Sequence, residues 1–131
     1  MASDYDSFPA SIYAQSVLAP DLDIYRQHFS APLHAINLSH GVMLAERGLL
    51  EGGDASAILE ALINIDQTRP WADRPFDGSF EDLFFLIEQE LGRQAGEDMA
   101  GKLHMGRSRN DMEHTMSVSY THLRAHETSS N

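Results

Sequence analysis

Cationic and polar side chains are concentrated in one short segment of this chain, residues 101–111. Its sequence is Gly-Lys-Leu-His-Met-Gly-Arg-Ser-Arg-Asn-Asp, and it holds the chain's single lysine, Lys102, followed by Arg107 and Arg109. A glycine-containing loop that opens a helix offers free backbone N–H groups and the positive end of the helix dipole to an anion. Arginine adds a planar fork that can hold a carboxylate with two hydrogen bonds. These residues therefore predict a small carboxylate site, with a solvated basic loop that caps a helix as the alternative.

Composition places this segment in an acidic chain of ordinary globular character. The 131 residues carry a formal net charge of −11, 42% of them are hydrophobic, and none is cysteine. Such a charge disfavours a broad surface for nucleic acid or anionic membrane, because these partners are bound through Lys and Arg. No apolar run approaches the roughly 18 residues of a membrane helix, and the first residues carry acids where a secretory signal carries Lys or Arg. We expect one soluble domain in the cytoplasm, without disulfides.

Hydrophobic spacing predicts helices on both sides of the segment and no strands. We expect an irregular lead-in over residues 1–23, a short helix from Asp23, a break at Pro32, and a second helix that ends at Gly48. A further helix begins after Gly52-Gly53, with Asp54 as its N-cap. Residues 68–78, rich in proline and charge, are predicted to form a loop.

Capping signals mark the remaining predicted helices. Ser79 and Asp82 have the spacing of a capping box, and Gly92 is expected to stop the helix that follows. Residues 96–108 show little helical pattern. Asn110 and Glu113 repeat the capping-box spacing, so a last helix is expected to begin near Asn110. The predicted fold class is all-α.

The segment 101–111 resembles the G-K-L-H-T-G-R-S-R-N-D motif of argininosuccinate lyases, with Met105 at the usual Thr and ten of eleven positions in agreement. Two upstream stretches resemble the family less strictly. Residues 81–88 are similar to its E-D-I-H-x-x-I-E helix, and residues 38–44 to the helix that carries A-H-x-x-M-L. The resemblance covers residues 24–116 and implies the N-terminal helical domain of the fumarase/aspartase-like lyase fold, truncated before the central helical bundle.

This resemblance implies the elimination of fumarate from argininosuccinate, giving arginine, or from a related succinyl-amine, without metal or organic cofactor. A base removes a proton beside a carboxylate, cationic and hydrogen-bonding groups stabilise the dianionic intermediate, and an acid protonates the departing nitrogen. The Asn that matches Asn110 contacts substrate in the family. Arg109, Ser108 and Asp111 are expected to bind or position substrate with it. Lys102, His104 and Arg107 are expected to support these residues from behind or to hold the conformation of the loop.

The catalytic residues themselves are not expected in this chain. In the family the base comes from a Gly- and Ser-rich loop much later in the sequence, and each active site forms where three subunits of a homotetramer meet. The resemblance therefore implies that this fragment alone is inactive and does not assemble, because the bundle helices are missing.

The sequence also departs from the family pattern. Phe84 stands where the family usually has His, which leaves the amine leaving group open, and the family's F-N-A-S motif has only a faint echo at residues 8–12, so Ser11 receives no role. Tyr120-Thr121-His122-Leu123 resembles a second family motif but lies too close to Asp111. Residues 118–128 also resemble translated sequencing-adapter read-through, so 117–131 is predicted to be a non-native tail.

The same residues also leave other functions open. A non-catalytic anion-binding or structural relative of the lyases is the main alternative, and a small helical interaction module is a third. His34 and His40 lie six positions apart, and His104 and His114 ten apart, which is not the i, i+4 spacing that holds a metal on one helix. We therefore predict no metal site and expect His40 and Trp71 to be structural. A Ser-His-Asp hydrolase lacks its nucleophile-elbow motif.

Overall fold

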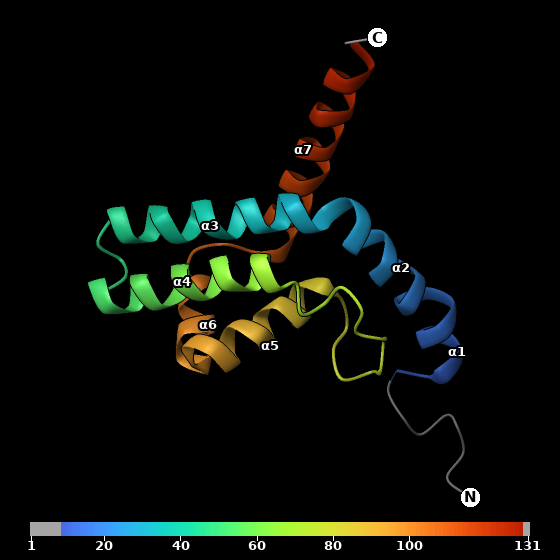
Figure 1. The fold of residues 1–131 in the computed structure, drawn as a ribbon, viewed down its shortest axis with the longest axis horizontal. Coiled ribbons are helices and arrows are strands. Elements are labelled where there is room, and N and C mark those ends of the chain that lie inside the picture. Colours follow the sequence, from blue (N-terminus) through green and yellow to red (C-terminus); the bar gives the residue numbers. More distant parts are fainter. Residues whose placement is uncertain (1–8, 130–131) are drawn as a thin grey trace, which may run out of the picture.

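Helices form all the regular structure between residues 9 and 129, the part of the chain that the computed structural model describes (Figure 1). The all-α prediction is confirmed for these residues. The helices are α1 (Ser11–Tyr13), η1 (Ala14–Leu18), α2 (Ala19–Ile24), η2 (Tyr25–Phe29), α3 (Ser30–Glu46), α4 (Gly52–Thr68), α5 (Leu83–Ala95), α6 (Glu97–Leu103) and α7 (Arg109–Ser129).

The first helices form one arm that leads into α3, where we expected an irregular lead-in. Helical structure runs from Ser11 without interruption, so that expectation is wrong from Ser11 onward, while residues 1–8 lie outside the described part of the chain. Two wide π-helical stretches, η1 and η2, each come just before a proline, Pro20 and Pro32. Proline lacks an N–H and crowds the preceding turn, and a wider turn relieves both problems. The expected break at Pro32 is therefore a change of helical pitch.

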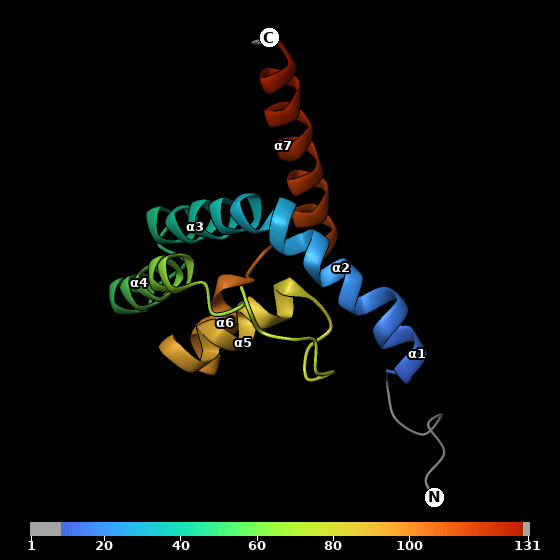
Figure 2. The same cartoon turned by 45° about the vertical axis from the view of Figure 1, so that its right-hand side comes forward.

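The core lies where α3 and α4 pack side by side and α5 and α6 cover them (Figures 1 and 2). Gly48, with a φ of 66°, follows the end of α3 as predicted and lets the chain reverse into α4. Trp71 is buried in the same core, as expected for a packing residue. The side chains that are almost fully buried are mainly leucine and isoleucine: Leu22, Leu33, Leu44, Ile58, Leu62, Ile65, Leu83, Leu91 and Leu103.

The ends of α4 and α5 differ from the capping predictions. Helix α4 begins at Gly52 with Glu51 before it, so Asp54 lies inside the first turn. Helix α5 is capped by Asp82, whose Oδ1 accepts from the Phe85 N–H at 3.1 Å. It continues past Gly92 to Ala95, and Gly96, with a φ of 103°, is the actual stop.

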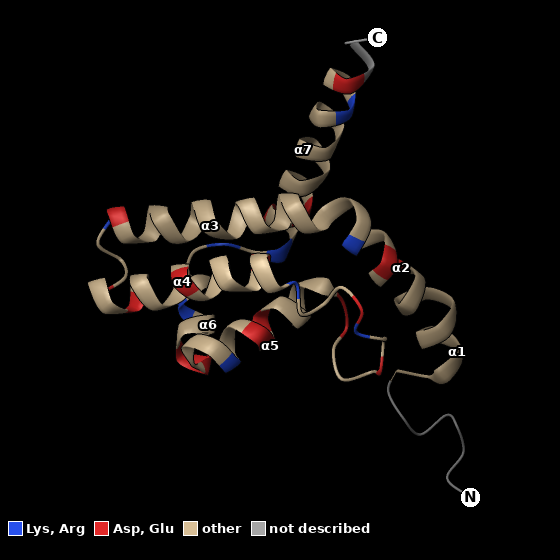
Figure 3. Cartoon of the chain, viewed as in Figure 1, with Lys and Arg blue, Asp and Glu red and all other residues tan. Residues whose placement is uncertain are grey.

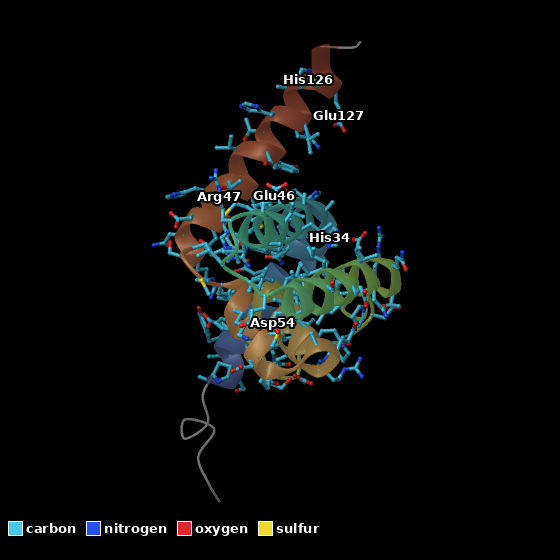
Figure 4. All side chains as sticks on the ribbon, turned by 90° about the vertical axis from the view of Figure 1, so that its left-hand side faces the viewer. His34, Glu46, Arg47, Asp54, His126 and Glu127 are labelled. Carbon is cyan, nitrogen blue, oxygen red and sulfur yellow. The ribbon has the colours of Figure 1, made fainter. Side chains whose placement is uncertain are left out.

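Helix α7 stands away from the other helices along most of its length (Figure 2). Met112 and Met116 in its first turns are buried, whereas residues 121–127 are all exposed. Figure 4 shows His126 and Glu127 well clear of the other helices. Within residues 9–129, no helix is both long and apolar enough to span a membrane.

Candidate functional site

The segment 101–111 connects the short helix α6 to the start of α7. We expected no helix over residues 96–108, but α6 occupies Glu97–Leu103, and the chain then turns through Gly106, whose φ is 74°. Lys and Arg mark this connection in Figure 3, where it runs beside α3. The first three residues of the segment therefore belong to a helix, whereas the sequence predicted a loop.

A capping box begins α7, but it is built from residues other than the predicted pair. The Oγ of Ser108 accepts from the Asp111 N–H at 3.3 Å, and Oδ2 of Asp111 accepts from the Ser108 N–H at 3.0 Å and from its hydroxyl at 2.9 Å. The predicted box of Asn110 and Glu113 is therefore wrong by two positions, although the predicted start of the helix is confirmed. These hydrogen bonds lower the pKa of Asp111.

Asn110 lies on the exposed side of this first turn. Its amide side chain makes no hydrogen bond with any residue in the described part of the chain, and Ser108 and Asp111 beside it are exposed as well. An exposed amide at a helix N-terminus can both donate and accept. Among the four predicted substrate-binding residues, Asn110 is thus the one whose side chain is free to contact a ligand.

Arg109 faces the protein and contacts carboxylates. Its guanidinium forms a close pair with Asp82 of the α5 cap, while Nε lies 3.2 Å from Oε1 of Glu113 and Nη1 lies 4.0 Å from Oε2 of Glu81. The guanidinium carbon also lies 5.2 Å from the centre of the Phe85 ring. A substrate carboxylate would have to compete with these groups for Arg109.

Lys102 is also paired. Its Nζ lies 2.6 Å from Oδ2 of Asp54 on α4, and hydrogen bonding to Asp54 raises the pKa of Lys102. This ion pair ties α6 to the first turn of α4. Its position supports the expected conformational role.

His104 and Arg107 form a partly buried cluster with residues of α3 and α5. Arg107 directs Nε and Nη2 toward Nδ1 of His104, at 3.3 and 3.0 Å, and Nη2 also donates to Oδ1 of Asn37 at 2.8 Å. The Oε1 atom of Glu88 lies 3.4 Å from Nε2 of His104. Burial lowers the pKa of His104 to about 4 and that of Arg107 to about 10.

His40 adds a contact between α3 and this loop. Its Nε2 lies 3.0 Å from the carbonyl oxygen of Met105, and burial lowers its pKa. Asn37 and Glu88 were not singled out from the sequence. A signal for Asn37 existed, since it is a polar residue on the buried side of an apolar helix, but nothing in the sequence showed which partner satisfies it.

Among residues 9–129, the hollow that lies beside the predicted binding residue Arg109 is too small for a substrate. The hollow beside Arg109, lined also by Asp82 and Phe84, has a volume of about 10 Å³. A much larger groove of about 850 Å³ lies between α3 and α7, with His40 and Met43 on one side and Val118 and Leu123 on the other. Within residues 9–129, no cluster of three or more His, Asp or Glu side chains is arranged to hold a metal ion.

The fold and this segment together define an all-α protein in which one polar loop, anchored in the helical core, opens a long projecting helix. Comparison with known proteins identifies its relatives. The chain is homologous to argininosuccinate lyases over most of its length, which confirms the resemblance seen in the motif.

Three relatives illustrate the match. The chain is 42% identical over 114 residues to argininosuccinate lyase 2 of Agrobacterium fabrum, which covers 87% of this chain and 23% of that protein. It is 40% identical over 93 residues to argininosuccinate lyase of Methanosarcina acetivorans, covering 71% and 18%. For the enzyme of Methanocaldococcus jannaschii the identity is 40% over 75 residues, covering 57% and 15%. The chain thus matches less than a quarter of the length of these relatives. No protein-family profile and no solved structure matches it.

Proposed function

We propose that this chain is the N-terminal part of a carbon–nitrogen lyase that eliminates fumarate from argininosuccinate, giving arginine, or from a related succinyl-amine. The observation that carries the proposal is the segment 101–111. Its motif matches that of the homologous lyases, and it forms an ordered turn that opens α7 with Asn110 exposed. In the same proposal the parent enzyme is a cytoplasmic homotetramer that needs no cofactor.

Within this proposal, the contacts of each residue in the segment indicate its role. Asn110 contacts substrate directly, and Ser108 and Asp111 position it through the capping box. Arg109 stabilises the negative charge that develops on the succinyl group, and its carboxylate partners hold the guanidinium in place until substrate binds. Phe84, which stands where the family has His, contacts the ring of His104 at 5.0 Å between centres. Because the residue at position 84 differs from that of the family, the proposal does not specify the amine leaving group.

The chain alone is proposed to be inactive. It spans 15–23% of the length of the relatives cited above, and the family's base and acid lie in later parts of the sequence. The absence of a substrate-sized cavity around Arg109 fits a site that other segments and subunits complete. The fold proposed for the parent is the fumarase/aspartase-like lyase fold, of which residues 24–116 form the N-terminal helical domain and 117–131 are not native.

Sequencing the source gene downstream of the codon for Met116 tests this proposal. A reading frame that continues into a long helical region with a second Thr-His motif and a Gly/Ser-rich loop supports the lyase. The enzyme expressed from that frame should release fumarate from argininosuccinate, and Asn110→Ala should reduce the release. A frame that stops after Asn131 would contradict the proposal.

A second candidate is a non-catalytic structural relative of the lyases. The observation that favours it is that the three cations of the segment already have partners inside the chain: Asp54 for Lys102, Asn37 for Arg107 and Asp82 for Arg109. Calorimetric titration with succinate of the full-length protein, expressed from the uninterrupted reading frame, separates the two candidates. Saturable heat that disappears in Asn110→Ala supports a carboxylate site, whereas no heat supports the structural relative.

A further inference from the structure

A buried hydrogen-bonded cluster connects the motif loop to two helices outside the motif. Asn37 on α3 is 2% exposed, and its Oδ1 accepts from Nη2 of Arg107 at 2.8 Å. A buried amide on an apolar helix is costly unless its polar atoms are satisfied. Arg107 provides that partner, and in return its guanidinium is held against α3.

The same guanidinium determines the protonation of His104. Two of its nitrogens, Nε and Nη2, point at Nδ1 of the imidazole, at 3.3 and 3.0 Å. Arginine has donors only, so the Nδ1 atom must accept and carries no proton. A neutral imidazole then has its proton on Nε2.

The Nε2 atom faces Glu88. It is buried and makes no hydrogen bond within the described residues, and Oε1 of Glu88 lies 3.4 Å away. A carboxylate at this point can accept the Nε2 proton after a small adjustment and also balances the charge of Arg107. Glu88 therefore lies beside the Nε2 edge of the ring, while Arg107 donates to the Nδ1 edge.

We propose that Asn37 and Glu88 are positioning residues for the segment 108–111: through Arg107 and His104 they hold the turn 104–107 against α3 and α5, and they keep His104 as the neutral tautomer with its proton on Nε2. Arg107 directly precedes Ser108, so the anchored guanidinium determines where the capping box, and with it Asn110, is placed. This inference rests on the proposed function in one respect: it takes residues 108–111 as the segment that binds substrate.

The charges around His104 support a neutral ring. Burial lowers the pKa of His104, and the nearby charges of Arg107 on the loop and His40 on α3 lower it further in the same direction, to about 4. Glu88 on α5 and Glu97 on α6 are the acids near this cluster, and burial together with Glu97 raises the pKa of Glu88. Arg107, despite a pKa lowered to about 10, is still charged at neutral pH.

The test uses the full chain, uniformly labelled with nitrogen-15 and studied by NMR at pH 7. His104→Gln identifies the His104 signals by their loss. We expect Nδ1 to resonate as an unprotonated nitrogen and Nε2 as a protonated one. A proton on Nδ1, or on both nitrogens, would overturn the proposal.

Variants test the positioning role. Asn37→Ala should shift the backbone amide signals of residues 108–111, and Asn37→Asp, which keeps the acceptor oxygen, should restore most of their positions. Glu88→Gln should move the Nε2 signal of His104 and the same amide signals. Asn64→Ala and Glu60→Gln on α4 are matched controls and should move none of them.

Two outcomes decide against the positioning role. Unmoved signals of residues 108–111 in folded Asn37→Ala and Glu88→Gln contradict it. If Asn37→Ala does not fold, signals that are unmoved in Glu88→Gln contradict it on their own. Fumarate release by the full-length parent is a separate readout: if Asn110→Ala leaves it unchanged while the His104 tautomer is as expected, the proposed role of Asn110 fails and the positioning cluster stands.

Discussion

At the scale of single residues, the segment shows how an acidic chain accommodates cations. Lys102, Arg107 and Arg109 are each partly buried, and each is held by an oxygen from another helix: from α4, α3 and the α5 cap. A partly buried charge is stable only when it is paired or hydrogen-bonded. The cluster of cations that predicted an anion site is therefore also a set of ties between helices.

Arg109→Ala separates these two roles. The loss of a cation where dianionic charge develops should reduce fumarate release by the full-length parent by about 100-fold. It also leaves Asp82, which caps α5, without its counter-ion, so the free energy of unfolding of this chain should fall by about 1–2 kcal/mol in urea denaturation. Arg47→Ala, at an exposed position after α3, is the control. Near-normal turnover together with lower stability would show that Arg109 is only structural.

His104 predicts a specific dependence of stability on pH. Its pKa is lowered from 6.5 to about 4 in the folded chain, so between these values the unfolded chain binds a proton that the folded chain does not. Stability should therefore be complete above about pH 6.5 and fall as the pH decreases toward 4, by roughly 3 kcal/mol at most. The difference in unfolding free energy between pH 5 and pH 7, measured by urea denaturation, should be smaller for His104→Gln than for the unsubstituted chain. His114→Gln, exposed on α7, should keep the full difference, and an equal loss in both variants would contradict the assignment.

At the scale of helices, several differences from expectation lie at helix ends. Ser79 has the capping-box spacing to Asp82, but its N–H and hydroxyl are both held by Asp77, at 2.9 and 2.5 Å, so Asp82 caps α5 instead. Gly92 lies inside α5 and packs closely against Glu97 of α6. Several residues near a helix end can serve as caps, and neighbouring contacts decide among them.

The turn between α5 and α6 depends on Gly96. Its φ of 103° lies in a region that residues with a Cβ atom rarely adopt, so Gly96→Ala should cost roughly 1–3 kcal/mol of unfolding free energy. Gly101→Ala is the matched comparison, because this glycine lies inside α6 with no atom within 4 Å of an added Cβ. It should stabilise the chain by about 0.5–1 kcal/mol through helix propensity. Equal effects of the two substitutions in thermal unfolding would contradict this account.

At the scale of the whole molecule, the described chain is a helical core with an arm at one end and a projecting helix at the other (Figures 1 and 2). The groove between α3 and α7 is lined largely by apolar side chains, and Val118 and Leu123 on its α7 side are more than half exposed. Beyond Met116, the ring of Tyr120 on α7 lies 5.4 Å from that of Phe29 and 5.7 Å from that of His28, both on η2. The tail from 117 onward thus contributes little to the core.

Truncation tests whether the tail is needed. A chain of residues 1–116 should still unfold cooperatively, with an unfolding free energy lower by about 1–2 kcal/mol, because the ring contacts of Tyr120 with Phe29 and His28 are lost. A chain of residues 1–120, which keeps Tyr120, should recover most of that difference. Circular dichroism during urea denaturation measures both. If the shorter chain fails to fold, the tail is part of the domain, and its prediction as non-native is wrong.

The sequence by itself determined the all-α class, the helical cores of α3, α4 and α5, and the segment 101–111 as the place to look for chemistry. Apolar spacing and a long motif are local properties of the chain, so both can be read along it. The tertiary structure decided which residues cap the helices, that α6 is helical, and that the cations of the segment face Asp54, Asn37 and Asp82 instead of solvent. The caps are local, but neighbouring contacts choose among several candidates. The partners of the cations lie far away in the sequence, and their meeting is set by packing and by the cost of leaving a buried charge unpaired.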